Sequence, residues 1–134
     1  MKDNKWDPFT IVHYLAVGFL VLVWLYVGIV PKLLFPDSGE IALMQKTGMF
    51  PGKEAFLVTV LGGAEAAWGI ILAVLHRSRR VHLLNIIGLL LLLLAGLGSS
   101  RDMLQAPFNP ITLTVPMLGL ALIGWVTAGG RKEI

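Results

Sequence analysis

The chain has 134 residues, 56% of them hydrophobic and 14% charged, so it has too little polar surface to cover a water-soluble globule of this size and belongs in a bilayer. It contains no cysteine, which excludes disulfides, thiolate metal sites and thiol–disulfide relays. The formal net charge is +3, and the basic residues form short clusters beside apolar runs, which fits lipid headgroups and leads us to expect no nucleic-acid partner.

Four apolar stretches approach the roughly 20 residues that a helix needs to cross the hydrocarbon core. They cover residues 10–31, 54–75, 81–100 and 111–128. The first has no A-x-A-like cleavage site and is longer than the apolar part of a signal peptide, so we expect it to remain as an anchor. The sequence thus predicts an all-α fold in a single domain, a polytopic membrane protein built as a four-transmembrane-helix bundle.

The connection after the first span carries its own helix signals. In PDSGEIALMQKTG (36–48), Asp37 and Glu40 have the spacing of a capping box, and Gly48 is placed as a helix C-cap. We therefore expect a short amphipathic helix at the membrane interface between spans 1 and 2. A solvated loop is the alternative.

The two remaining connections are short or rigid. HRSRRVH (76–82) is so short that the second and third spans must be antiparallel neighbours. RDMLQAPFNP (101–110) contains Pro107 and Pro110, which prevent a regular helix and predict a rigid turn before the fourth span.

The lysines and arginines are unequally divided between the two sides of the predicted bundle. One side has seven and the other has four. These are Lys2, Lys5, Arg77, Arg79, Arg80, Arg131 and Lys132 on the first side, and Lys32, Lys46, Lys53 and Arg101 on the second. By the positive-inside rule we expect both termini to be cytoplasmic, in a bacterial cytoplasmic membrane.

Glu65 lies in the middle of the second apolar stretch, in LGGAEAAWGI (61–70). At helical spacing, Gly62 and Gly69 lie close to it on the same face. Small residues let helices approach closely in lipid, so this face should pack against other helices and Glu65 should point inward. Two further stripes are predicted to face inward: Trp24, Gly28 and Lys32 on the first span, and Asn85, Gly88, Ala95 and Ser99 on the third.

An ionised carboxylate in the middle of a bilayer costs about 2.5–3.5 kcal/mol on insertion scales. Glu65 must therefore be protonated, paired or hydrated. Intramembrane ionisable groups usually mark a ligand, proton or ion pathway, which makes Glu65 the candidate catalytic residue. The alternative is a structural role, in which a protonated Glu65 donates one hydrogen bond between helices.

Three segments resemble the DoxX-like family of small four-helix integral membrane proteins: VWLYVGIVPKLL (23–34), GGAEAAWGIILAV (62–74) and APFNPITLTVPMLGLALIG (106–124). The resemblance extends over nearly the whole chain. The positions that match the family motif are Trp24, Gly28, Pro31, Lys32, Glu65, Pro107, Asn109 and Pro110. The family implies the four-helix fold. Its name-giving members are a subunit of thiosulfate:quinone oxidoreductase, and a distant animal relative is an assembly chaperone for acetylcholine receptors.

We predict a ligand site in the outer half of the bundle, lined by Trp24, Lys32, Glu65, Arg101 and Asn109. A quinone headgroup suits this set, because its carbonyls can accept hydrogen bonds while a protonated Glu65 donates or relays a proton. Alternatively, Lys32 and Arg101 only extend to lipid headgroups and Asn109 caps a turn.

Two classes of function stay open. One is a redox-associated component that binds a quinone or a similar lipophilic ligand, and the other is a non-enzymatic accessory or assembly protein that binds lipid or a partner complex. The chain has no nucleotide, flavin or metal motif, so we expect no intrinsic cofactor and a quinone drawn from the membrane. Candidate partners are membrane lipid, an oxidoreductase subunit and a second copy of the chain.

The three histidines all lie toward the side predicted to be cytoplasmic. We expect His76 and His82 to be interfacial residues that flank the basic turn, and His13 to form hydrogen bonds at the headgroup level. Haem ligation by two of them across facing helices is the alternative.

Overall fold

The computed structural model describes residues 7–34, 45, 48, 51–98 and 110–129, and the regular structure in these residues is entirely helical. The helices are α1 (Pro8–Ile29), the π-helical turn η1 (Val30–Leu34), α3 (Glu54–Val74), α4 (Arg79–Leu97) and α6 (Pro110–Thr127). Each of the four long helices begins and ends within a few residues of a predicted apolar segment. The all-α fold with four helices is therefore confirmed.

Helices α1 and α4 begin where a local side chain accepts a hydrogen bond from a free N–H group of the first turn. Asp7 Oδ1 accepts a hydrogen bond from the backbone N–H of Thr10 at 3.1 Å, and Pro8 occupies the first helical position of α1. At the start of α4, Ser78 Oγ accepts from the N–H of Val81 at 3.5 Å. These caps place the helix ends independently of how the helices pack.

Helix α1 changes to the wider turn η1 close to a proline. Pro31 has no N–H, and its ring clashes with the carbonyl one turn earlier, so a regular α-helix cannot continue through it. The π-helical turn from Val30 to Leu34 accommodates this interruption.

The chain divides into two compact units, and α1 contributes to both of them. The central unit is Val21–Val74. The terminal unit consists of Met1–Leu20 together with Leu75–Ile134.

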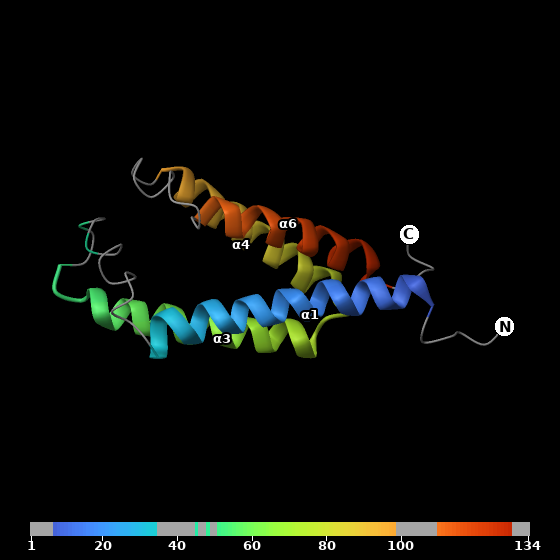
Figure 1. Ribbon diagram of the computed structural model, residues 1–134, viewed down its shortest axis with the longest axis horizontal. Helices are drawn as coiled ribbons and strands as arrows, with labels where there is room; N and C mark the ends of the chain where they lie inside the picture. Colours follow the sequence, from blue (N-terminus) through green and yellow to red (C-terminus); the bar gives the residue numbers. More distant parts are fainter. Residues whose placement is uncertain (1–6, 35–44, 46–47, 49–50, 99–109, 130–134) are drawn as a thin grey trace. The chain divides into compact units, whose positions relative to one another are not determined.

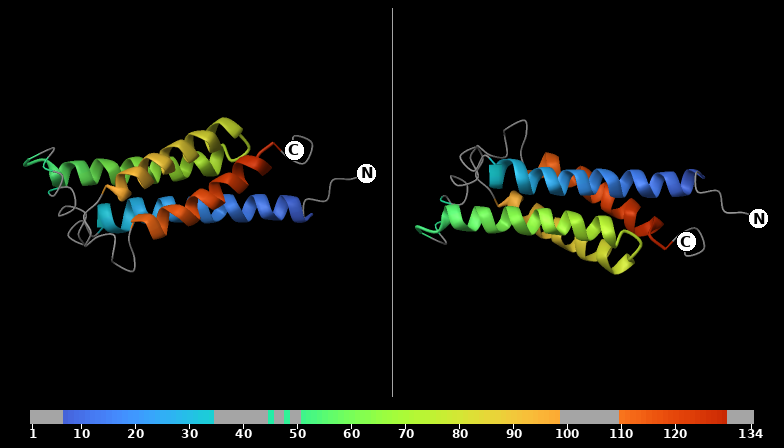
Figure 2. Two further views of the ribbon diagram at one scale, coloured as in Figure 1. Left: turned by 90° about the horizontal axis from the view of Figure 1, so that it is seen from above. Right: turned by 90° about the horizontal axis from the view of Figure 1, so that it is seen from below.

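In the central unit, α3 packs against η1 and against the second half of α1. Figure 2 shows these segments, in cyan and green, side by side. Gly62 and Gly69 are buried on α3, as are Trp24 and Gly28 on α1. These four residues of the predicted stripes therefore lie in packing faces, and the burial of Lys32 lies outside the description.

In the terminal unit, α4 runs along α6, as Figure 1 shows. The residues of α4 that are buried lie on one face: Val81, His82, Asn85 and Leu89. Asn85 is buried as predicted, but Gly88 is only half-buried and Ala95 is exposed. The predicted stripe on this helix is thus wrong at Ala95, because the buried face continues through Leu89 instead, and Ser99 lies outside the described residues.

Among the helices of the described residues, two are long and apolar enough to cross a membrane by length and composition: α1 with 22 residues and α3 with 21. The apolar part of α6, Ile111–Thr127, is shorter. Large apolar side chains such as Phe19 (53% exposed) and Leu91 (62% exposed) point outward, as expected for helices surrounded by lipid.

The segment predicted to form an interfacial helix, 36–48, lies outside the described residues except for Gln45 and Gly48. Gly48 has a φ of 65°, the left-handed conformation of a C-cap glycine. Its N–H donates to the carbonyl of Gln45 at 3.1 Å. The helix itself stays a prediction.

Candidate functional site

Two residues of the predicted ligand site lie on facing helices of the central unit. Glu65 is half-buried on α3, and a Cβ built on Gly28 would lie 3.1 Å from the Cβ of Glu65. Trp24, one turn earlier on α1, is 7% exposed, and its Cβ is 3.2 Å from the position of a Cβ on Gly69. Glu65 and Trp24 therefore both flank the closest approach of α1 to α3.

Of the other predicted site residues, Gly28 lies at this contact. Pro31 and Lys32 belong to η1 of the same unit. Pro110 begins α6, which belongs to the terminal unit. The positions Arg101, Pro107 and Asn109 lie outside the described residues.

The terminal unit contains a second group of polar side chains, formed by His13, His76, His82 and Thr127. They come from the first half of α1, the turn before α4, the first turn of α4 and the end of α6. His13 is 6% exposed, His82 is fully buried and Thr127 is 7% exposed. We call this group the histidine cluster.

Hydrogen bonds join the members of the histidine cluster. His13 Nδ1 lies 2.7 Å from Thr127 Oγ1, and His13 Nε2 lies 3.0 Å from His76 Nδ1. His82 Nε2 donates to the backbone carbonyl of His76 at 2.6 Å. The ring centroids of His13 and His76 are 5.2 Å apart, and those of His13 and His82 are 6.1 Å apart.

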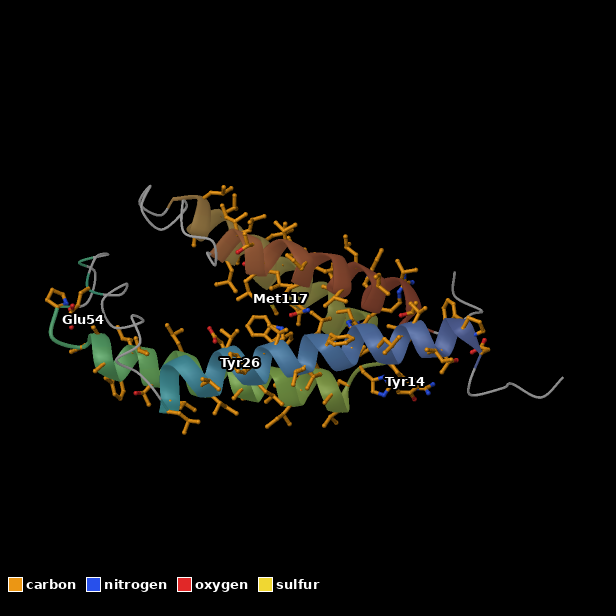
Figure 3. The ribbon with its side chains drawn as sticks, viewed as in Figure 1. Tyr14, Tyr26, Glu54 and Met117 are labelled. Carbon is orange, nitrogen blue, oxygen red and sulfur yellow. The ribbon has the colours of Figure 1, made fainter. Side chains whose placement is uncertain are left out.

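The outer side of the cluster is formed by Tyr14 and Arg77. The ring of Tyr14 lies 5.4 Å from that of His76, and Arg77 donates to the Tyr14 hydroxyl at 3.3 Å. Figure 3 shows Tyr14 in the N-terminal half of α1. His76 is half-buried, so its imidazole lies between the buried ring of His13 and these exposed side chains.

The direction of each hydrogen bond follows from its acceptors. The Thr127 hydroxyl donates its one proton to the carbonyl of Ile123 at 2.8 Å, so it accepts from His13 Nδ1. A neutral His13 then accepts at Nε2 from Nδ1–H of His76. His82 carries its proton on Nε2, because a carbonyl only accepts.

The electrostatic surroundings favour the neutral form of His76. Burial lowers the pKa of His76 below its ordinary value of 6.5, and the positive charge of Arg77 and the nearby His82 lower it further.

Within the described residues, no group of three or more His, Asp or Glu side chains is arranged to hold a metal ion.

The side chains of His13 and His82, expected at the membrane interface, are buried within the protein, and their level in the bilayer stays a prediction. A signal for this was present in the sequence. His82 lies three residues before Asn85 and therefore near the face that we had assigned to the interior. Likewise, His13 shares a helical face with Ala16, Val17 and Leu20, all of them buried.

Comparison with known proteins identifies a family for the chain. Residues 21–122 match the DoxX-like family. Neither a curated protein nor a solved structure matches the chain significantly. The family match includes most of the chain, and two of the helices within it or overlapping it are apolar enough to cross a bilayer. The protein is therefore a membrane protein and belongs to the DoxX-like family.

Proposed function

We propose that this protein binds a quinone or a similar lipophilic ligand in the outer half of its helical bundle, as a redox-associated component of a bacterial cytoplasmic membrane. In this proposal all four helices cross the bilayer and both termini are cytoplasmic. The observation that carries the proposal is the position of Glu65, a half-buried carboxyl group on an apolar helix, directly beside the tight approach of Gly28 to α3.

An ionised carboxylate at this position is costly unless it is protonated, paired or hydrated, because lipid and apolar side chains solvate its charge poorly. A protonated Glu65 can donate a hydrogen bond to a quinone carbonyl and transfer a proton when the quinone is reduced. Trp24 supplies an aromatic wall and an indole N–H on the facing helix. Both residues flank the same helix–helix approach, which supports a shared role.

Lys32, Arg101 and Asn109 complete the proposed site as its polar mouth, and their part rests on the sequence. Their side chains can donate to the second carbonyl of a quinone or to a lipid headgroup. Pro107 and Pro110 would hold Asn109 in a rigid turn before α6. The proposed partners are membrane lipid and either an oxidoreductase subunit or a second copy of the chain.

The test is a titration of the purified protein in detergent with a short-chain quinone. Glu65→Gln should weaken binding about tenfold or more, which corresponds to ~1.4 kcal/mol. The matched control is Glu54→Gln at the start of the same helix, which should bind like the wild type. Trp24→Phe and Trp68→Phe form a second pair, of which only the first should weaken binding.

Two results would contradict the proposal. Equal binding to Glu65→Gln and Glu54→Gln would return Glu65 to a structural role. No saturable binding to the wild-type protein would favour the accessory or assembly function instead.

A further inference from the structure

The histidine cluster lies in the terminal unit and shares no residue with the proposed ligand site. Its members are far apart in sequence, and each comes from a different helix or turn. It also differs from ordinary headgroup anchors, because His13 and Thr127 are buried and hydrogen-bonded to each other at 2.7 Å. An inference from this cluster is therefore independent of quinone binding.

We infer that His13 and His76 form an acid–base site that binds one proton, which enters at Nε2 of His76 and is held on that ring while His13 accepts the hydrogen bond from Nδ1 of His76. The geometry carries the inference. The two imidazoles are joined directly, Nε2 to Nδ1, at 3.0 Å, and Thr127 sets the direction of their hydrogen bond.

The proton step needs no rearrangement of the rings. In the neutral pair each imidazole carries its proton on Nδ1, and Nε2 of His76, which has no hydrogen-bond partner among the described residues, takes up the incoming proton. His76 is then a cation, and its Nδ1–H still donates to Nε2 of His13. His13 stays neutral, because it is 6% exposed and burial penalises its charged form more than that of the half-buried His76. Nδ1–H of His13 still donates to Thr127, so every hydrogen bond is retained.

The pair holds only one proton, and the proton goes no further through these residues. A second proton would leave two N–H groups facing each other across the 3.0 Å contact. Beyond His13, the Thr127 hydroxyl already donates to the carbonyl of Ile123, which cannot take up a proton. The site therefore stores a proton and returns it through His76.

His82 has a different role. Its Nε2–H is occupied by the carbonyl of His76, and its Nδ1 is buried without a hydrogen-bond partner among the described residues. A proton on Nδ1 would be buried without an acceptor among the described residues, which is costly. His82 therefore stays neutral and is a positioning residue that holds the turn containing His76.

The charged and titratable side chains around the His13–His76 pair determine the pH at which the pair takes up its proton. The charged or titratable side chains that face it from the described residues are Arg77 and His82, with Tyr14 against the ring of His76. Burial and the positive charge of Arg77 both oppose the added charge, in agreement with the lowered pKa of His76. The pair is therefore neutral at neutral pH and takes up its proton on acidification.

The experiment is nitrogen NMR of the full-length protein in detergent micelles, with ¹⁵N-labelled histidine. The chain has three histidines, so three imidazoles are observed. At neutral pH we expect two rings protonated on Nδ1, which is the less common tautomer in solution, and one on Nε2. On acidification, one proton should charge His76, which then carries a proton on both nitrogens, while His13 keeps its Nδ1–H tautomer.

Thr127→Val tests the coupling between the residues. Without the hydroxyl acceptor, His13 should move its proton to Nε2 and donate to His76, so that His76 also changes to the Nε2–H tautomer at neutral pH. Thr59→Val is the matched control, because Thr59 makes the same backbone hydrogen bond one turn back, to Ala55 at 3.0 Å, at an exposed position. It should leave all three imidazoles unchanged.

The inference would be overturned by three Nε2–H tautomers in the wild type, or by three histidines that titrate independently near 6.5. It would equally be overturned by a tautomer of His76 that is unaffected in a folded Thr127→Val protein. If Thr127→Val does not fold, the wild-type tautomers alone decide the matter.

Discussion

Gly28 comes so close to Gly62 that a Cβ on Gly28 would lie 2.7 Å from the carbonyl oxygen of Gly62. It would also lie 2.8 Å from the backbone nitrogen of Ala66. Both neighbours are backbone atoms of α3, so they cannot rotate away as a side chain would. The distance between α1 and α3 in the central unit is therefore set by the lack of a side chain at residue 28.

Gly28→Ala should destabilise the protein by about 1–3 kcal/mol, because α1 and α3 must separate to admit the methyl group. Gly18→Ala on the same helix is the control, since a Cβ there meets nothing within 4 Å. Reversible unfolding by a denaturing detergent measures both variants. Equal stability of the two would mean that the close approach is not maintained in solution.

Gly124→Ala should also destabilise the protein by about 1–3 kcal/mol, through the histidine cluster. A Cβ on Gly124 would lie 2.9 Å from both Cε1 and Nδ1 of His82. This ring cannot easily move, because its Nε2 is bonded to the carbonyl of His76. Gly119→Ala on the same helix meets no atom within 4 Å and should be neutral or slightly stabilising. The imidazole NMR signals of His82 should shift in the first variant and stay in place in the second.

Stability should fall on mild acidification. The pKa of His76 is below 6.5 in the folded protein because of burial, Arg77 and His82, so the unfolded chain binds a proton at a higher pH than the folded protein does. The contribution of His76 is therefore fully present above about pH 6.5 and is lost as the pH falls from there toward the folded pKa, below which it levels off. Unfolding curves recorded from about pH 8 to about pH 5 measure this.

Removal of the positive charge of Arg77 tests whether this pH dependence of stability comes from His76. Arg77→Gln should raise the pKa of His76 toward 6.5 and so reduce the loss of stability. Arg80→Gln removes an exposed charge from the same basic segment and should leave the profile as in the wild type. If Arg77→Gln and Arg80→Gln changed the pH profile of stability equally, the effect would come from the net charge of the protein and not from His76.

The proposed orientation can be tested with single cysteines, because the chain has none of its own. A membrane-impermeant thiol reagent should label Ser38→Cys in intact cells. It should label Arg80→Cys only after the inner face of the membrane is opened. The reverse pattern would place the termini outside.

Local sequence features determined the helices and the packing faces of α1 and α3 at Gly28 and Gly62. Apolar length and the caps at Asp7 and Ser78 depend on neighbouring residues only, so the helix limits could be predicted closely. The inward faces at Gly28 and Gly62 also followed from composition, because residues without bulky side chains are the ones that let backbones approach. The proposed roles of Arg101 and Asn109 stay predictions from sequence.

The histidine cluster was decided by the tertiary structure. Helical periodicity shows which face a residue occupies, but it does not show which residue of another helix lies at the same height. His13 and Thr127 are 114 positions apart in sequence, yet their side chains meet at 2.7 Å. That contact turns a histidine expected at the headgroups into a buried member of a hydrogen-bonded chain, because an imidazole can be buried at low cost only when both of its nitrogens find partners.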